Sequence, residues 1–182
     1  KEVVNANIDK INNSDVHERL GLEPHKYILL SAHREENIDN EKNFMSLMNA
    51  INTMAEEYDM PVIYSVHPRS AKFIEKRNFE FHPLVKKMQP FSFSDYNFMQ
   101  KNAYCVVSDS GTIPEESALL KFPAVSIRTS TERPEALDMG GFILGGITSE
   151  QLIQSVDMSI KMAENGFCGM TVPAYDNNNV SD

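Results

Sequence analysis

The sequence predicts an α/β domain built on a doubly wound parallel sheet, and three features indicate this class. Short apolar runs alternate with helical patterns, short connections join them, and Pro and Gly residues separate them at regular intervals. Strands buried on both faces read as continuous apolar runs, as in a parallel sheet covered by helices on both sides. With 182 residues, 41% of them hydrophobic, the chain is long enough for one core.

The first half of the chain reads as a lead-in followed by two strand–helix units. Residues 1–20 favour a helix or a lead-in segment. The apolar run YILLSAH at 27–33 predicts a strand, and residues 41–58 predict a helix because their apolar side chains recur at helical spacing. The run PVIYSVHP at 61–68 is rich in β-branched residues and predicts a second strand, and SAKFIEKR at 70–77 has room for about two helical turns.

The second half continues the alternation. The run LVKKM at 84–88 predicts a shorter strand before a helix near 95–101. The remaining expected pairs of strand and helix are 103–109 with 113–121, 123–128 with 132–139, and 142–146 with 150–164. Pro134 is expected at the start of the helix over 132–139. Thr148 or Ser149 could cap the last helix, and Gly166 could end it.

Composition excludes several classes of protein. The 17 basic and 26 acidic residues give a net charge of −9, which argues against a nonspecific nucleic-acid binder. No stretch approaches the roughly 18 apolar residues of a membrane span, and no signal peptide opens the chain, so we expect a soluble, cytoplasmic protein. The distant Cys105 and Cys168 and the unpaired histidines favour neither a disulfide nor a metal site.

Polar clusters follow four of the expected strands. They are SAHREEN after the first strand, HPRS after the second, SDSGT after the fourth and RTSTER after the fifth. In a parallel α/β sheet, ligands bind in the crevice outside the carboxyl ends of the strands. We therefore expect these clusters to converge on one site.

The segment SDSGTIPEESALLKFP at 108–123 is the most informative. Its Ser110-Gly111-Thr112 turn leads directly into a helix, so backbone N–H groups and the positive helix end could face a phosphate. Glu116, in the first turns of that helix, could accept hydrogen bonds from vicinal hydroxyls such as those of a ribose. An alternative stays open: Thr112 and Glu115 have the spacing of a capping box, and the two glutamates could be solvated charges at a helix start.

Histidine and arginine supply further candidates at the strand ends. His33 could protonate a leaving group or bind a phosphate, and Arg34 beside it offers a planar fork for the same anion. His67 stands at the end of the second strand, but either histidine could be purely structural. Arg128 and Arg133 add two cations, or they pair with neighbouring glutamates on the surface.

Three segments together resemble the non-hydrolysing UDP-N-acetylglucosamine 2-epimerases: SAHREEN, VVSDSGTIPEESALLKFPAVSIR and TSTERPEA. The resemblance extends over most of residues 27–140 in order and spacing. It implies the UDP-binding, Rossmann-like C-terminal domain of a two-domain GT-B fold, with residues 1–182 forming that domain. The chain begins at Lys1 and ends on DNNNVSD, so we expect the N-terminal domain and a final helix to lie outside it.

The resemblance implies a reaction and its residues. Anti elimination of UDP gives a 2-acetamidoglycal, and UDP adds back to yield the C2 epimer, without NAD or a metal. Ser110, Gly111 and Thr112 would hold the UDP phosphate, Glu116 the ribose hydroxyls, and His33 would stabilise the departing UDP. The carboxylates that move the C2 proton belong to the N-terminal domain of the family.

The same resemblance assigns the remaining positions. Arg133 would stand at the diphosphate side of the cleft, and Phe91 and Tyr96 would contact the uracil ring. Arg34 and His67 resemble positions that some bacterial members use for a second, regulatory UDP-sugar. Family members are commonly homodimers, so a homodimer is expected for the full-length protein.

The sequence departs from the family pattern at two places. Thr112 replaces the usual second glycine, which adds a side chain near the phosphate but leaves the backbone donor in place. Ser31-Ala32 before His33 and Glu35-Glu36 after Arg34 resemble the branch that forms UDP-N-acetyl-L-fucosamine for capsule or O-antigen sugars. Two alternatives remain at this stage. One is a GT-B glycosyltransferase that transfers sugar from a UDP-sugar, and the other is a non-catalytic UDP-sugar-binding module.

Overall fold

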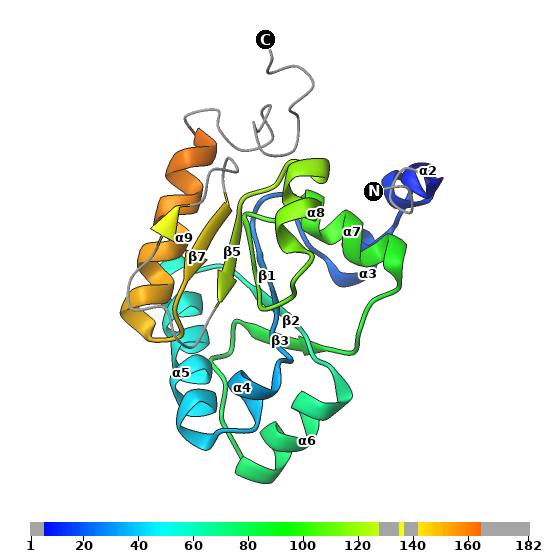
Figure 1. Ribbon diagram of the computed structural model, residues 1–182. Helices are drawn as coiled ribbons and strands as arrows, with labels where there is room; N and C mark the ends of the chain where they lie inside the picture. Colours follow the sequence, from blue (N-terminus) through cyan, green and yellow to red (C-terminus); the bar gives the residue numbers. More distant parts are fainter. Residues whose placement is uncertain (1–5, 128–134, 137–141, 165–182) are drawn as a thin grey trace.

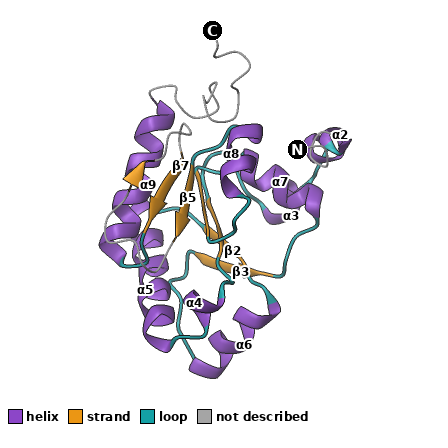
Figure 2. Cartoon of the chain, in the orientation of Figure 1, coloured by secondary structure: helices purple, strands orange, loops and turns teal. Residues whose placement is uncertain are grey.

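The fold is a twisted sheet with helices on both faces (Figure 1, Figure 2). The computed structural model describes residues 6–127, 135–136 and 142–164. Within these ranges one seven-stranded sheet has the order β3-β2-β1-β4-β5-β7-β6. Its strands are β1 Ile28–Ser31, β2 Val62–Ser65, β3 Val85–Met88, β4 Cys105–Ser108, β5 Ala124–Ile127, β6 Glu135–Ala136 and β7 Phe142–Gly145. All pairings are parallel except that of β6 with β7, which confirms the doubly wound, Rossmann-like class.

The helices lie in two layers. Their bounds are α2 Ile8–Asn12, α3 Val16–Leu20, α4 Glu35–Ile38, α5 Glu41–Tyr58, α6 Pro68–Arg77, α7 Phe93–Lys101, α8 Ile113–Leu120 and α9 Ser149–Glu164. Helices α5 and α9 pack side by side over one face, and α7 and α8 lie over the other (Figure 1). Helix α4, a single turn that overlaps the end of the SAHREEN segment, was not expected from the sequence.

Alternate residues of β1, β2 and β4 enter two separate cores. Ile28 and Leu30 of β1 face the cluster built with α5 and α9, whereas Leu29 faces the cluster built with α7 and α8. The large side chain of Phe44 on α5 is fully buried in the first cluster, which contributes about 1.5–3 kcal/mol relative to exposure. Burial on both faces explains why the strands read as continuous apolar runs.

The prediction of a helix over 132–139 is wrong for residues 135–136, the part of this range that the structure describes. Glu135 and Ala136 form β6, which runs antiparallel to β7, with Glu135 opposite Leu144 and Ala136 opposite Ile143. Without β6, the outer edge of β7 would present unpaired backbone N–H and C=O groups. Pairing with β6 satisfies part of that edge. Pairing across the sheet thus overrides the local helical pattern.

Close packing brings the last helix against the sheet at Gly145. A Cβ atom there would lie 2.2 Å from Ser155 Oγ and 2.8 Å from Ser155 Cβ. Helix α9 can therefore approach β7 only where β7 lacks a side chain. The expected cap is also present, because Thr148 Oγ1 accepts a hydrogen bond from the Gln151 amide at 3.1 Å.

Asp95 ties the N-terminal segment to α7. Ser14 Oγ donates to Asp95 Oδ1 at 2.7 Å, and Arg19 Nη2 lies 2.6 Å from Asp95 Oδ2. Burial alone would raise the pKa of Asp95, but the hydrogen bonds from Ser14 and Arg19 outweigh it, and the pKa lies below its ordinary value. Among the described helices, none combines the length and apolarity that a membrane crossing requires.

Candidate functional site

The polar segments after β1 and β4 meet where the strand order reverses. From β1 the chain proceeds outward through β2 to β3, then returns to place β4 on the other side of β1. Ser31 and Ser108, the last residues of β1 and β4, are register partners, so the two strands end side by side. Ligands of doubly wound sheets bind outside the strand ends at such a reversal. The expected convergence of these two clusters is confirmed.

Asp109 joins the two segments. Its Oδ2 accepts hydrogen bonds from the backbone N–H groups of His33 and Arg34, both at 2.9 Å, and from Asn37 Nδ2 at 2.8 Å. Its Oδ1 accepts from the His33 amide at 3.1 Å and lies 3.4 Å from His33 Nδ1. Asp109 and Asn37 are both fully buried. Neither residue was predicted as a site residue, although Asp109 lies between the two serines of the SDSGT motif.

His33 stands between this carboxylate and a second histidine. Its side chain is 43% exposed, and its ring stacks on that of His67 with centroids 5.9 Å apart and planes 27° apart. His67 is the N-cap residue of α6, and its Nδ1 accepts the Arg69 amide at 3.1 Å. A neutral His67 therefore carries its proton on Nε2. His33 and His67 therefore lie next to each other, as expected if the polar clusters after the first two strands converge.

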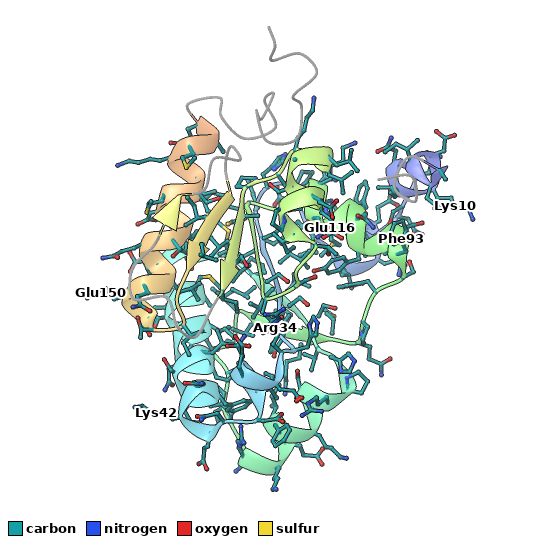
Figure 3. All side chains as sticks on the ribbon, in the orientation of Figure 1. Lys10, Arg34, Lys42, Phe93, Glu116 and Glu150 are labelled. Atoms are coloured by element: carbon teal, nitrogen blue, oxygen red, sulfur yellow. The ribbon has the colours of Figure 1, made fainter. Side chains whose placement is uncertain are left out.

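The nearby arginines differ in their engagement. The Arg69 guanidinium forms a two-point ion pair with Asp39, through Nε and Nη2. Arg34 is bound through its backbone amide to Asp109, and its side chain reaches only to 4.0 Å from Glu36 Oε1. Figure 3 shows Arg34 below α8 in this view, near the sheet reversal.

The start of α8 is arranged differently from a capping box. Thr112 is the N-cap residue with φ −94° and ψ −2°, and its side chain makes no cap bond, so the capping-box alternative is wrong. Its hydroxyl instead donates to Glu116 Oε2 at 3.2 Å and lies 3.0 Å from Ser110 Oγ. The Thr112 amide donates to Ser110 Oγ at 3.3 Å and Pro114 has no N–H, so the remaining N–H groups of the first turn and the positive end of the helix are left for another acceptor.

Gly111 is open to the surface. A Cβ atom at this position would meet nothing within 4 Å, and its φ lies outside the left-handed region. The fold itself therefore does not require glycine here. The missing side chain lets an acceptor approach the backbone of the turn, as anion-binding turns at helix starts require.

Glu116 is held at both carboxylate oxygens. Gln100 Nε2 donates to Oε1 at 3.0 Å, and Thr112 donates to Oε2 at 3.2 Å. Gln100 is fully buried, and its own Oε1 has no partner. These two contacts orient Glu116 on α8 (Figure 3) and leave further lone pairs of the carboxylate for a ligand hydroxyl.

Tyr96 lies near the ends of β1 and β4 and near Glu116. Burial raises its pKa to about 12, with the charges of Glu116 and Asp109 adding to the rise and the hydroxyls of Ser31 and Ser108 opposing it. Phe91 is half-buried against the apolar cluster beneath α7 and α8. Tyr96 is thus near the other predicted residues, and Phe91 shares its core.

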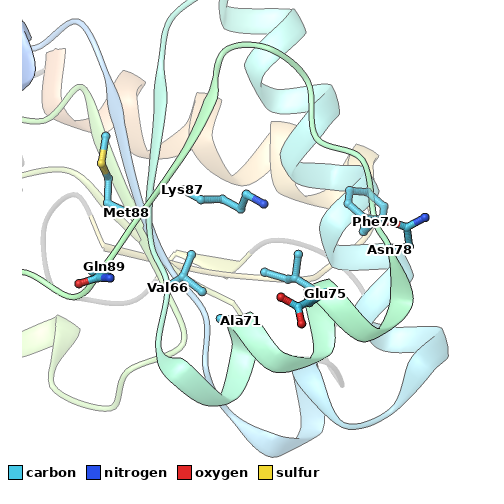
Figure 4. A pocket seen from close by; sticks show the side chains of 9 residues that line it. Val66, Ala71, Glu75, Asn78, Phe79, Lys87, Met88 and Gln89 are labelled. Atoms are coloured by element: carbon cyan, nitrogen blue, oxygen red, sulfur yellow. The ribbon is translucent and has the colours of Figure 1, made fainter.

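Two further candidates lie outside the described residues: Arg128 and Arg133. Among residues 6–127, 135–136 and 142–164, no group of three His, Cys, Asp or Glu side chains is placed to hold a metal ion. A separate hollow of about 470 Å³ lies between α6 and β3 (Figure 4). Its polar lining includes Glu75, Lys87 and Gln89, and none of the residues predicted for ligand binding lines it.

Comparison with known proteins identifies a family. The model of the family described as UDP-N-acetylglucosamine 2-epimerase matches residues 2–181. A UDP-N-acetylglucosamine 2-epimerase of Methanocaldococcus jannaschii is 34% identical over 143 residues, which are 76% of this chain and 39% of that relative. A Methanococcus maripaludis protein of the same name is 34% identical over 140 residues, or 75% of this chain and 38% of its own length.

Solved structures agree. The UDP-N-acetylglucosamine 2-epimerase of Rickettsia bellii superposes with a TM-score of 0.74 at 32% identity, over 97% of this chain and 47% of its own. The M. jannaschii enzyme in complex with UDP-GlcNAc and UDP superposes with a TM-score of 0.73 at 29% identity, over 85% of this chain and 44% of its own. The chain thus spans about two-fifths of the length of these sequence relatives.

Proposed function

Because the chain belongs to the UDP-N-acetylglucosamine 2-epimerase family, we propose that it supplies the UDP-binding half of an enzyme that interconverts the C2 epimers of a UDP-N-acetylhexosamine. An N-terminal domain of a GT-B arrangement completes the cleft and provides the carboxylates that move the C2 proton. The enzyme is an isomerase that consumes no NAD or metal, and it works in the cytoplasm, as a homodimer at full length.

One observation carries the proposal. At the sheet reversal, Asp109 binds the backbone of the His33 turn, while the residues directly after it form the open helix start at Ser110 and Gly111. A histidine and an anion-binding turn therefore meet at one place. Glu116 is connected to the same turn, because the Thr112 hydroxyl donates a hydrogen bond to its carboxylate. This juxtaposition suits a nucleoside diphosphate, whose phosphates and ribose need both kinds of partner.

This arrangement supports the following proposed roles. Ser110, Gly111 and Thr112 bind the UDP phosphate, and Glu116 accepts hydrogen bonds from the ribose hydroxyls. In the first step a base of the N-terminal domain removes the C2 proton, the C1–O bond to UDP breaks, and a 2-acetamidoglycal remains. His33 stabilises the charge that develops on the departing UDP. UDP then adds back to C1, and a proton returns to C2 on the opposite face.

Five more residues complete the proposed machinery. Phe91 and Tyr96 contact the uracil ring, and Arg133 lies at the diphosphate. Arg34 and His67 contact a second UDP-sugar that regulates turnover. Because His67 stacks on His33, this second ligand would lie beside the substrate site.

The substrate proposed for this chain is UDP-2-acetamido-2,6-dideoxy-L-talose, converted to UDP-N-acetyl-L-fucosamine for capsule or O-antigen polysaccharide. The residues around His33, at 31–32 and 35–36, support this branch. UDP-N-acetylglucosamine is the competing substrate. Proton NMR of the complete protein with each compound in D₂O tests both, because the true substrate exchanges its C2 proton and forms the C2 epimer. Transfer of sugar to an acceptor without exchange would indicate a glycosyltransferase, and binding without turnover a non-catalytic module.

The isolated 182-residue chain is expected to show no epimerisation. It offers one wall of the cleft and lacks the groups that move the proton. Incubation with either UDP-sugar and detection of the C2 epimer by NMR checks this. Turnover by the chain alone would contradict the division of labour between the two domains.

A further inference from the structure

The two oxygens of the Asp109 carboxylate perform different tasks. Oδ2 accepts three hydrogen bonds, from the amides of His33 and Arg34 and from Asn37 Nδ2, at 2.8–2.9 Å. These contacts hold the backbone of the turn after β1. Oδ1 has one longer contact with the His33 amide, at 3.1 Å, and faces His33 Nδ1 at 3.4 Å. The hydrogen bonds to Oδ2 could therefore hold the turn even if the side chain at 109 were uncharged. The contact of Oδ1 with Nδ1, in contrast, affects only the imidazole of His33.

We propose that Asp109 is the positioning residue of His33: Oδ1 fixes the imidazole in the tautomer with its proton on Nδ1, so that Nε2 is the atom that exchanges a proton at the ligand. The role in turnover rests on the proposed epimerase function. A carboxylate can only accept from the ring, and which nitrogen of a histidine is protonated is set by the partner of the other.

The surroundings of the ring support this assignment. Asp109 is fully buried, so its orientation is fixed by four hydrogen bonds and not by solvent. The stacked His67 ring covers one face of His33 at 5.9 Å. His67 Nδ1 is already an acceptor for the Arg69 amide. Nδ1 of His33 lies 3.4 Å from Asp109 Oδ1, and 43% of the His33 side chain is exposed.

The tautomer matters for the chemistry. A ring with its proton on Nδ1 can take a second proton on Nε2, and the buried carboxylate then compensates the positive charge beside the departing UDP anion. A neutral ring with its proton on Nε2 could give that proton away only by becoming an imidazolate. Asp109 thus acts through His33, as the carboxylate of a catalytic triad acts through its histidine.

Asp109→Asn separates the two tasks. The amide oxygen should take the place of Oδ2, where three donors converge, and this puts the NH₂ group in the place of Oδ1. The amide then donates to His33 Nδ1 and forces the ring proton onto Nε2. We expect kcat of the complete protein to fall by about 10²- to 10⁴-fold, the range of a lost acid–base group, with KM changed by less than about threefold.

The tautomer is read directly by ¹H–¹⁵N NMR of the complete protein with ¹⁵N-labelled histidine. Comparison with the spectrum of His33→Gln identifies the His33 signals. We expect Nδ1–H in the wild type and Nε2–H in Asp109→Asn. Asn37→Ala is the matched control, because it removes a donor to Oδ2 and leaves Oδ1 in place. It should retain the Nδ1–H signal.

Each outcome decides the proposal. Nε2–H in the wild type, Nδ1–H retained in Asp109→Asn, or a kcat within threefold of the wild type would overturn it. If Asp109→Asn does not fold, the wild-type tautomer alone decides. If the complete protein epimerises no UDP-N-acetylhexosamine, the proposed function fails, whereas the NMR result still decides which nitrogen Asp109 fixes.

Discussion

Replacing Glu116 by Ala tests the nucleotide site most directly. The change removes the carboxylate expected to bind the ribose hydroxyls, and hydrogen bonds to a charged acceptor contribute about 1.5–3 kcal/mol. We therefore expect the Kd for UDP to rise roughly 10- to 150-fold. The change also removes the acceptor of the fully buried Gln100 Nε2, whose side-chain oxygen already lacks a partner. An unsatisfied buried donor costs about 1–3 kcal/mol of unfolding free energy.

Calorimetric titration with UDP and urea unfolding separate these two effects. Glu116→Gln keeps an acceptor for Gln100 but loses the charge, so it should retain most of the stability and show an intermediate Kd. Glu115→Ala is the matched control, because this exposed neighbour sits on the same helix. If Glu116→Ala binds UDP as tightly as Glu115→Ala does, the assignment of the ribose site is wrong.

Three further predictions concern the site and the fold. Ser110→Ala should weaken UDP binding in titrations, whereas His33→Ala should lower kcat more than affinity; the reverse pattern would exchange their roles. Gly145→Ala should lower the unfolding free energy by about 1–3 kcal/mol through overpacking against α9, while Gly111→Ala, with open space around it, should leave stability unchanged and weaken UDP binding. Because its pKa is lowered, the stabilising contribution of Asp95 should be complete above the ordinary value of 3.8 and lost as the pH falls through the folded-state value. Acid unfolding curves of Asp95→Asn should lack that loss.

The fold was predictable because burial dominates the sequence pattern. Strands such as β4 and β5 are covered on both faces, so their residues form apolar runs that no surface element shares. The short strand β6 was not predictable from the local sequence. Its two residues are fixed by hydrogen bonds to β7, and such pairing leaves no periodic signal in a two-residue segment.

The site was predictable where a residue type carries its own chemistry. His33, Ser110 and Glu116 stand out as a titratable ring, a turn before a helix and a carboxylate near its start. Asp109 and Asn37 do not, because their importance comes from being buried against each other across 72 residues of sequence. Aspartate in an S-D-S turn reads locally as a loop residue. The signal that could have found it is an ionisable residue placed directly after a strand that is otherwise apolar.

The bond from the His33 amide to Asp109 spans 76 residues of sequence, and this has a consequence for folding. The intervening chain runs from α4 to β4 and includes α5, β2, α6, β3 and α7, so the bond closes a long loop and should form only when β1 and β4 are paired. We therefore expect the proposed nucleotide site to be completed late in folding and to open when the centre of the sheet opens. Hydrogen exchange of the His33 and Arg34 amides should follow global unfolding and slow further with UDP in proportion to its binding free energy.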